Sequence, residues 1–261
     1  MTSAAAGTAR ILADLAAQGP VSGWPRSLVE TCRADTDVTG AGLALLTSDG
    51  VGGILAATDG AAQRMEDLQF ALGEGPCREA TRSGDAVLVA DLREIQQHRW
   101  PAFTPAAVEG GVLAVFAFPL QVGGTSIGVL DLYRESRGAL TGPQLRSATS
   151  YAEAATAVLL LLQDADLPSG RPGEDPAGAL ADVLDRRAVV MQASGMVSVQ
   201  LGTTPDAALV RLRAHSFATD RPILDVAADV VARRIRFDHS EAGTSTAPWT
   251  PPGGRSPEED R

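Results

Sequence analysis

The sequence predicts an α+β domain, an antiparallel sheet covered by helices, followed by a small all-α module of three helices. Five apolar strand segments lie between residues 42 and 134 and are interleaved with helical stretches. Two pairs of these strands are joined by short Gly-rich turns, which favours antiparallel pairing over a doubly wound parallel sheet. Beyond residue 178 every apolar periodicity is helical.

Two helical segments precede the sheet. Residues 1–20 are Ala-rich and predict a short helix, which we expect to fray. Residues 26–37 predict a second helix, with Leu28, Val29 and Cys32 on one face.

The strands are identified by short apolar runs bounded by turn residues. Ser48-Asp49-Gly50 is the turn of the first hairpin, and Gly123-Gly124-Thr125 is the turn of the second. In the last strand, alternation places Asp131 and Tyr133 on the same face. The strands are expected at residues 42–50, 51–59, 86–92, 112–122 and 126–134.

Helices fill the connections between the strands. A start signal at Leu140-Thr141-Gly142-Pro143 introduces a long helix. The helices are expected at residues 61–70, 77–83, 102–109 and 143–163.

A Pro/Gly/acidic stretch then separates the sheet from the helical module. Within the module, Gly202 is a C-cap candidate, and Thr204-Pro205-Asp206 and Asp220-Arg221-Pro222 are helix starts. The expected parts are an N-terminal extension at 1–24, the α+β domain at 25–164, a linker at 165–177, the helical module at 178–237 and a disordered tail at 238–261.

Composition excludes several classes of protein. Only two cysteines, Cys32 and Cys77, and three histidines occur, without metal-ligand spacing, so we expect no metal and no cofactor. No phosphate-binding glycine motif or nucleophile elbow is present, and we expect no enzyme. No signal peptide or membrane-length apolar run is found, so we expect a cytoplasmic protein that does not enter membranes.

Charge is divided unevenly along an acidic chain of net charge −10. Residues 176–237 carry eight Arg against six acidic residues, net +2, whereas residues 21–165 carry ten against seventeen, net −7. Because phosphate neutralisation drives nucleic-acid affinity, any nucleic acid would bind through the helical module.

The module resembles the ANTAR domain, a helical RNA-binding module of bacterial antitermination regulators. The resemblance rests on the V-x-Q-A-x-G-M run from Val190 to Met196, on Leu201-Gly202, Pro205 and Leu212-Arg213. It implies binding of paired RNA hairpins as a dimer. Ser194 stands where family members usually carry Lys, and a basic residue there would suit a phosphate contact.

Residues 25–164 resemble a GAF domain, a ligand-sensing α+β fold. The resemblance rests on DLQFALGEGPCREA at 67–80, Val89-Ala90-Asp91-Leu92, Arg99-Trp100-Pro101, Ala117-Phe118-Pro119-Leu120 and GVLDLYR at 128–134. It implies a small-molecule site, for which we name Glu74, Cys77, Trp100 and Asp131.

The RNA-contact candidates lie in the net-basic module. Phe217 could stack an unpaired base or pack in the core, and both readings stay open. The candidates are Arg187, Arg211, Arg213, His215, Phe217, Arg221, Arg233 and Arg234, with Arg236 as a further arginine of this segment.

The main hypothesis is a transcription antitermination regulator that binds nascent RNA under control of a sensory domain. Three short helices with arginines could instead form a DNA-binding regulator. A third alternative is a GAF-fold redox enzyme that uses Cys77.

The helix at 143–163 predicts a homodimer. Its apolar residues repeat at three and four, and Val158 to Leu162 is apolar all round, so a second surface should cover it. The alternative cover is the N-terminal helix with Ile11, Leu12 and Leu15. The expected seam is Leu145, Ala148, Tyr151, Ala152, Ala155, Val158, Leu159 and Leu162.

Overall fold

The computed structural model describes residues 3–47, 50–95, 98–164, 176–219, 221–238 and 244–245. The chain forms two compact units, Met1–Arg187 and Ala188–Arg261, and the division falls within helix α7 (Pro176–Leu201). Most of the expected linker and tail, and the turn residues Ser48 and Asp49, lie outside the described residues.

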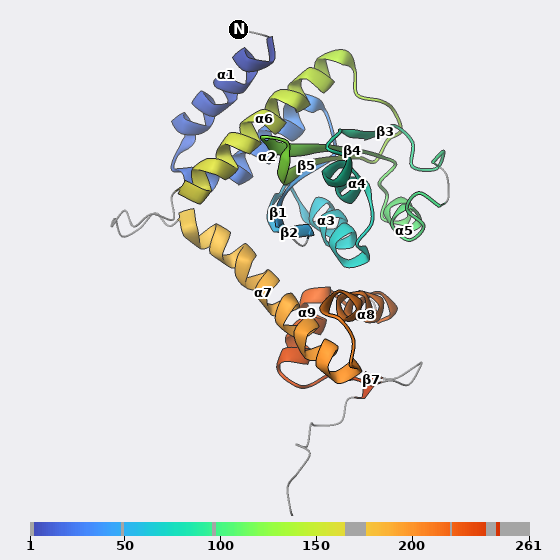
Figure 1. Ribbon diagram of the computed structural model, residues 1–261. Helices are drawn as coiled ribbons and strands as arrows, with labels where there is room; N and C mark the ends of the chain where they lie inside the picture. The colour runs from blue at the N-terminus through green and yellow to red at the C-terminus, as the bar shows by residue number, and fades with distance from the viewer. Residues whose placement is uncertain are drawn as a thin grey trace, which may run out of the picture. The chain divides into compact units, whose positions relative to one another are not determined.

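The first unit is built on one five-stranded sheet (Figure 1). Its strand order is β2-β1-β5-β4-β3, and every neighbouring pair is antiparallel, which confirms the α+β prediction. Gly123 and Gly124, with φ of 57° and 82°, form the turn between β4 and β5. The strands are β1 (Gly40–Thr47), β2 (Gly50–Ala57), β3 (Val87–Val89), β4 (Ala114–Val122) and β5 (Thr125–Arg134).

Helices cover both faces of this sheet (Figure 1). One face carries α1 (Ser3–Gln18), α2 (Trp24–Thr36) and α6 (Gly142–Asp164), with the short 3-10 turn η1 (Val21–Gly23) between α1 and α2. The other face carries α3 (Gly60–Leu72), α4 (Pro76–Ser83) and α5 (Phe103–Glu109).

Strand β5 supplies side chains to both resulting cores. Leu130 and Leu132 pack toward α2 and α6, whereas Val129 and Tyr133 pack toward α3 and α4. The pleat sends successive side chains to opposite faces, so both sets come from one strand. A polar side chain on β5 must therefore find its hydrogen-bond partners inside one of these two cores.

Local signals fix the ends of the helices that carry the site. The Asp59 carboxylate accepts a hydrogen bond from Ala62 N at 2.8 Å and caps α3. Gly73, with φ of 68°, ends α3 in the left-handed region, and Pro76 is at the start of α4. These caps set a short α3–α4 connection over the sheet.

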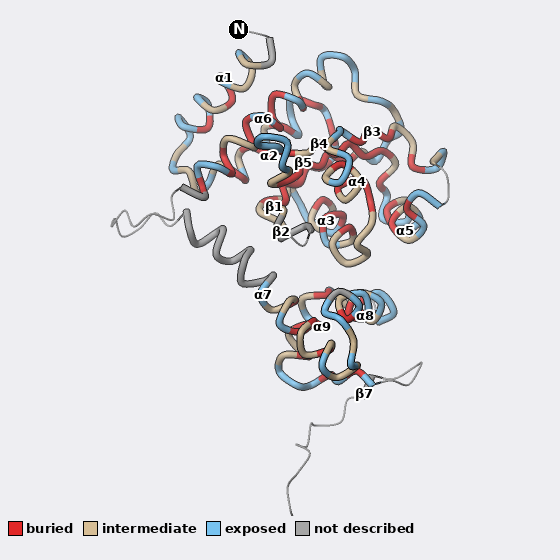
Figure 2. Tube along the Cα trace, in the orientation of Figure 1, coloured by how far each residue is buried: buried red, intermediate tan, exposed pale blue. Residues whose placement is uncertain are grey.

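The N-terminal helix α1 is docked, contrary to the expectation that it frays. Ile11 and Leu15 are buried among residues of α6 and α2 (Figure 2). A side-chain hydrogen bond from Thr8 to Glu153 of α6, at 2.6 Å, adds to this contact. The apolar stripe of α1 therefore forms part of the first core.

This packing removes the argument for a dimer seam on the helix at 143–163. The residues expected to meet a partner copy are covered within one chain by α1, α2 and the sheet. Only Leu160 and Leu161 of its apolar end are exposed. The alternative cover, the N-terminal helix, is the one found.

The second unit contains three helices, as expected. Thr204 caps α8 by accepting a hydrogen bond from Ala207 N at 3.3 Å, and Gly202, with φ of 55°, follows the end of α7. A small ladder of two short strands was not expected. The further elements are α8 (Pro205–Ala218), α9 (Ile223–Val231), β6 (Arg236–Phe237) and β7 (Thr244–Ser245). Within the described parts of the chain, no helix has the length and apolarity that a membrane crossing needs.

We expect Leu15→Ala to lower the free energy of unfolding by about 2–4 kcal/mol, because it opens a cavity between α1 and α6. The control is Leu161→Ala, at a side chain that is 45% exposed, which should cost well under about 1 kcal/mol. Urea unfolding followed by tryptophan fluorescence measures both. Equal effects would mean that α1 does not stay docked.

Candidate ligand site and candidate nucleic-acid interface

A cluster of polar side chains is buried between the sheet and helices α3 and α4. Asp131 and Tyr133 come from β5, Glu66 and Gln69 from α3, and Cys77 from the start of α4. Each of the five is at most 2% exposed. Alternation on β5 and the one-turn spacing of Glu66 and Gln69 bring four of them together.

Gln69 is the centre of the hydrogen bonding. Its amide donates to the Tyr133 hydroxyl at 3.1 Å and to Asp131 Oδ2 at 3.5 Å. Its oxygen accepts from the backbone N–H of Cys77 at 2.8 Å, at the first turn of α4. The Tyr133 hydroxyl donates to Glu66 Oε1 at 2.8 Å. One glutamine thus joins β5, α3 and α4.

Two carboxyl groups share this apolar setting. Burial raises the pKa of Glu66 to about 7, although the hydrogen bond from Tyr133 acts to lower this pKa. Burial and the Glu66 charge raise the pKa of Asp131 well above its usual range. Asp131 Oδ1 has no hydrogen-bond partner among fixed donors. Because burial raises both pKa values and the Glu66 charge raises that of Asp131, the pair favours a state with at most one negative charge near neutral pH.

Two glycines make room for the cluster. A Cβ on Gly42 of β1 would clash with Glu66 Oε1, so the strand passes the carboxyl without a side chain. Gly75 has φ of 125°, and a Cβ there would lie 2.8 Å from Gln69 Oε1. The backbone is thus shaped around these two side chains.

The environment of Cys77 disfavours thiol chemistry. The side chain is fully buried, and burial together with Asp131 and Glu66 raises the pKa of its thiol well above the usual value. Because the thiolate is the nucleophile, a thiol kept protonated is inert.

The other two residues named for the ligand site serve helix α5. Glu74 Oε1 accepts from the backbone N–H groups of Ala102 and Phe103, at 2.7 and 2.8 Å, and so caps α5. Trp100 is buried edge-to-face against Phe103, with the Arg99 guanidinium 4.6 Å from its ring centroid. Of the four predicted residues, Cys77 and Asp131 come together with Glu66, Gln69 and Tyr133.

Sequence reasoning missed three residues of this cluster. Tyr133 shares the face of Asp131 by alternation, so it could have been included. Glu66 and Gln69 carry no such signal, because charged and amide residues one turn apart usually mark a solvated helix face.

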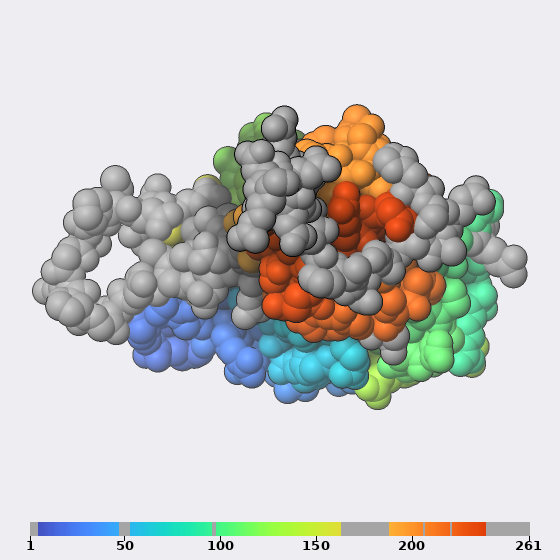
Figure 3. Space-filling model, turned by 90° about the horizontal axis from the view of Figure 1, so that it is seen from below, coloured from blue at the N-terminus to red at the C-terminus, as the bar shows by residue number. Residues whose placement is uncertain are grey.

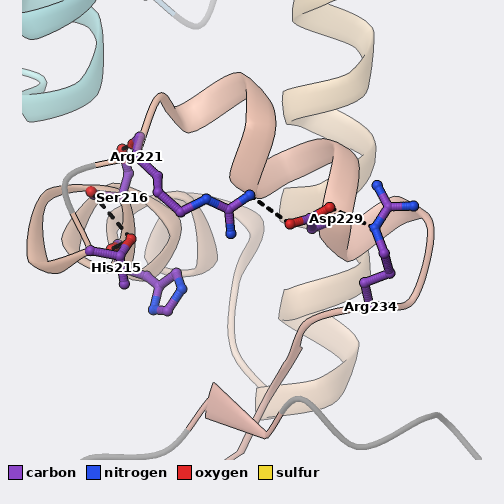
Figure 4. A network of polar contacts seen from close by, with 6 residues as sticks. His215, Ser216, Arg221, Asp229 and Arg234 are labelled. Carbon is purple, nitrogen blue, oxygen red and sulfur yellow. Dashed lines mark hydrogen bonds and ion pairs between the residues drawn. The ribbon is translucent and has the colours of Figure 1, made fainter.

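In the second unit, one aspartate holds two of the candidate arginines (Figure 4). Arg221 and Arg234 approach the Asp229 carboxylate from opposite sides, at 2.6 and 2.7 Å. Hydrogen bonds from these guanidinium groups lower the pKa of Asp229. Part of the positive charge counted from the sequence is therefore neutralised inside the unit.

His215 and Phe217 of α8 lie in different surroundings. The His215 ring packs edge-to-face on Phe237, with centroids 5.5 Å apart, and burial followed by the Arg221 charge lowers its pKa, which favours the neutral ring. Phe217 is 61% exposed, which excludes the core-packing alternative. Ser216, between them, donates to Arg221 O at 2.6 Å and fixes the start of α9 (Figure 4).

Position 194 does not face solvent, which corrects the expectation of a phosphate contact there. Ser194 is fully buried, and its hydroxyl donates to Pro205 O at the start of α8, at 2.5 Å. With Ala193, also fully buried, it allows close packing inside the unit.

The remaining arginines differ in exposure. Arg211, Arg233 and Arg236 are exposed, and Arg213 is half-buried. The side chain of Arg187 lies outside the described residues. Figure 3 shows the surface of α7, α8 and α9 in orange and red. The candidate arginines therefore differ both in exposure and in whether they pair with Asp229, and Arg234 is exposed and also paired.

Comparison with known families identifies two domains in the chain. A GAF domain model matches residues 26–159, about half of the chain, and an ANTAR domain model matches residues 179–231. The chain belongs to the GAF-domain family and carries an ANTAR domain after it. The two domains are regulatory, sensory in the first case and of antitermination regulators in the second, so the chain is a regulator.

Several solved structures are similar to this chain at low identity. The GAF domain of an Acinetobacter phosphoenolpyruvate-protein phosphotransferase is 11% identical, with TM-score 0.47, and covers 66% of this chain and 100% of its own. The corresponding Coxiella burnetii domain is 14% identical, with TM-score 0.47, and covers 62% and 98%. A type II free methionine-R-sulfoxide reductase from Thermoplasma acidophilum is 16% identical, with TM-score 0.40, and covers 54% and 95%. No curated protein sequence matches the chain.

We expect the stability of the GAF domain to fall as pH rises from about 4.5 to about 7, because folded Glu66 holds a proton that the unfolded chain has released. Above about 7 the contribution of Glu66 is lost, and Asp131, raised in the same direction, extends the decline. Glu66→Gln, which keeps an oxygen to accept from Tyr133, should flatten the profile.

Urea midpoints measured across this pH range test this expectation. The matched control is Glu109→Gln on α5, an exposed glutamate. If the urea midpoints of Glu66→Gln and of the wild type changed equally with pH, the buried carboxyl would not be titrating.

We expect Ser194→Lys to destabilise the ANTAR domain, because it places an ammonium group in the fully buried α7–α8 junction. Ser194→Ala removes only the hydrogen bond to Pro205 and should cost about 1 kcal/mol. Thermal unfolding followed by circular dichroism compares the two variants. A lysine variant as stable as the wild type would show that position 194 reaches solvent.

Proposed function

We propose that this protein is a transcription antitermination regulator that binds hairpins of nascent RNA through its ANTAR domain, under control of its GAF domain. The observation that carries the proposal is the ANTAR match over residues 179–231, in a unit that exposes arginine side chains at its surface. Binding of a nascent transcript places the protein in the cytoplasm.

Charge supports the ANTAR domain as the RNA-contacting part. Residues 176–237 have net charge +2, whereas residues 21–165 have net charge −7. A phosphate backbone is attracted to the first segment and repelled by the second. Homodimerisation stays a prediction, although the seam expected for it on α6 is covered within one chain.

The GAF domain supplies the regulation in this proposal. A small molecule is the input that its family suggests. In this proposal the GAF domain responds at the buried Glu66–Asp131 pair. Asp131 of β5 is bonded to Gln69 of α3, and Gln69 is also bonded to the first turn of α4. A redox activity is not favoured, since the Cys77 thiol is buried and kept protonated.

The alternative is a DNA-binding regulator. Competition of hairpin RNA against duplex DNA for the full-length chain separates the two. Preference for duplex DNA at equal salt would replace the proposal.

We expect Arg211→Gln combined with Arg236→Gln to weaken hairpin-RNA binding by the full-length chain. Each lost phosphate contact should reduce the slope of log K against log salt by about 0.7–0.9. The matched control is Arg82→Gln combined with Arg93→Gln, two exposed arginines of the GAF domain, which changes the net charge equally.

Fluorescence anisotropy at several salt concentrations measures these slopes. Loss of affinity in the control pair alone would place the RNA on the GAF domain and contradict the proposal.

A further inference from the structure

A groove runs along one face of α7 in the ANTAR domain. It has a volume of about 420 Å³. Met196 and Val199 of α7 and Ile235 beyond α9 give it an apolar lining, and Arg233 and Arg236 line it from the same side as Ile235. Its volume lies within the range of small-molecule sites.

The groove is open because of what α7 presents there. Val199 is 82% exposed, although an apolar residue of this size normally packs in a core. Gly195, one turn before it, carries no side chain, and a Cβ built there would meet nothing within 4 Å. The groove therefore lies over a glycine and is bordered by an unpacked valine.

The opposite wall of the groove is formed by the segment that follows α9. Arg233 takes the left-handed conformation, with φ of 58°, and so turns the chain after α9. Ile235 is buried, and the backbone N–H of Phe237 donates to Gln200 Oε1 of α7 at 2.8 Å. The segment 233–236 is thus fixed beside α7.

The charged side chains at the groove are arginines. Of the residues that the structure describes, Arg233 and Arg236 line it and no acidic residue does. An apolar floor with two guanidinium groups beside it suits a molecule that has a flat apolar face and is attached to anionic groups.

A nucleobase on a sugar-phosphate chain has this chemistry. Proteins read RNA mainly through unpaired loop bases, which lie against apolar or planar side chains. Gln192, which also lines the groove, carries an amide that can hydrogen-bond a base edge. A peptide partner would need an apolar side chain flanked by acids, and it remains an outcome of the test.

We propose that the α7 groove binds an unpaired base from the loop of an RNA hairpin, with Arg233 and Arg236 on the adjacent phosphates. The inference rests on the proposed function and adds the place and mode of recognition. It assigns base recognition to α7 and the 233–236 segment, and not to the exposed Phe217 of α8.

The test fills the groove. Gly195→Leu places a side chain in open space and removes a helical glycine, so the ANTAR domain should fold at least as stably. The matched control is Ala214→Leu, at an exposed alanine of α8. The probe is a fluorescent hairpin selected from a pool with randomised loops by binding to the full-length protein.

We expect Gly195→Leu to weaken binding of this hairpin at least tenfold and Ala214→Leu to leave it within about threefold. With 2-aminopurine substituted in turn at each loop position, one position should change its fluorescence on binding. That change should disappear in Gly195→Leu and persist in the control.

A second pair keeps the test independent of groove filling. Val199→Glu introduces an acid at an 82% exposed position, and Val210→Glu does the same on α8 at a 59% exposed position. Only the first should lose the 2-aminopurine signal, since it adds a negative charge beside the bound base.

The possible failures are distinguishable. If no hairpin is enriched, the proposed function fails, and the inference fails with it. If hairpins bind and Gly195→Leu binds as the wild type does, or loses no more than Ala214→Leu, the function stands and the groove is not the base site. If Ala214→Leu alone lost affinity for the hairpin, recognition would be assigned to α8. If both variants bound RNA as the wild type does, the groove would be left to a protein partner.

Discussion

Burial of the sheet on both faces is the constraint on which the first unit depends. The central strand β5 lies between β1 and β4 and carries Asp131 and Tyr133 on the face toward α3 and α4. Water cannot satisfy these groups, so protein groups must do so. Gln69 meets the requirement by bonding both side chains and the first turn of α4. The placement of α3 and α4 thus follows from two polar residues on one strand.

The same constraint makes the cluster sensitive to charge. A carboxylate in this setting lacks the water that stabilises it on the surface, and the described cluster contains no cation. A proton or a cationic ligand is the simplest compensation. Because the groups belong to β5, α3 and α4, any change in their charge acts on three elements at once. This is a reasonable property for a sensory domain, in which a small input must alter packing.

The sequence predicted the strands well because alternation and glycine turns are local signals. It did not predict which surface covers α6. The apolar residues on the outer face of α6 show that another surface packs on it. The same apolar pattern would fit α1 or the α6 helix of a second copy. The buried Glu66 escaped prediction for a related reason, since its burial depends on Gly42 of a distant strand leaving room for the carboxyl. Ser194 likewise depends on the approach of Pro205. Each miss concerns a long-range contact that no local pattern encodes.

The ANTAR domain shows why a charge count is a weak guide to affinity. Its net charge is +2, and two of its arginines are committed to Asp229. Counterion release grows with the number of phosphates neutralised, so few exposed arginines give a small electrostatic contribution. Tight binding would then need apolar or stacking contacts, which do not weaken with salt as phosphate contacts do. Val199 of α7, which is 82% exposed, is an apolar group that could supply such a contact. An acidic regulator of this kind would have a low non-specific electrostatic attraction for nucleic acid. Its affinity would then depend on apolar and stacking contacts, so it would bind RNA selectively.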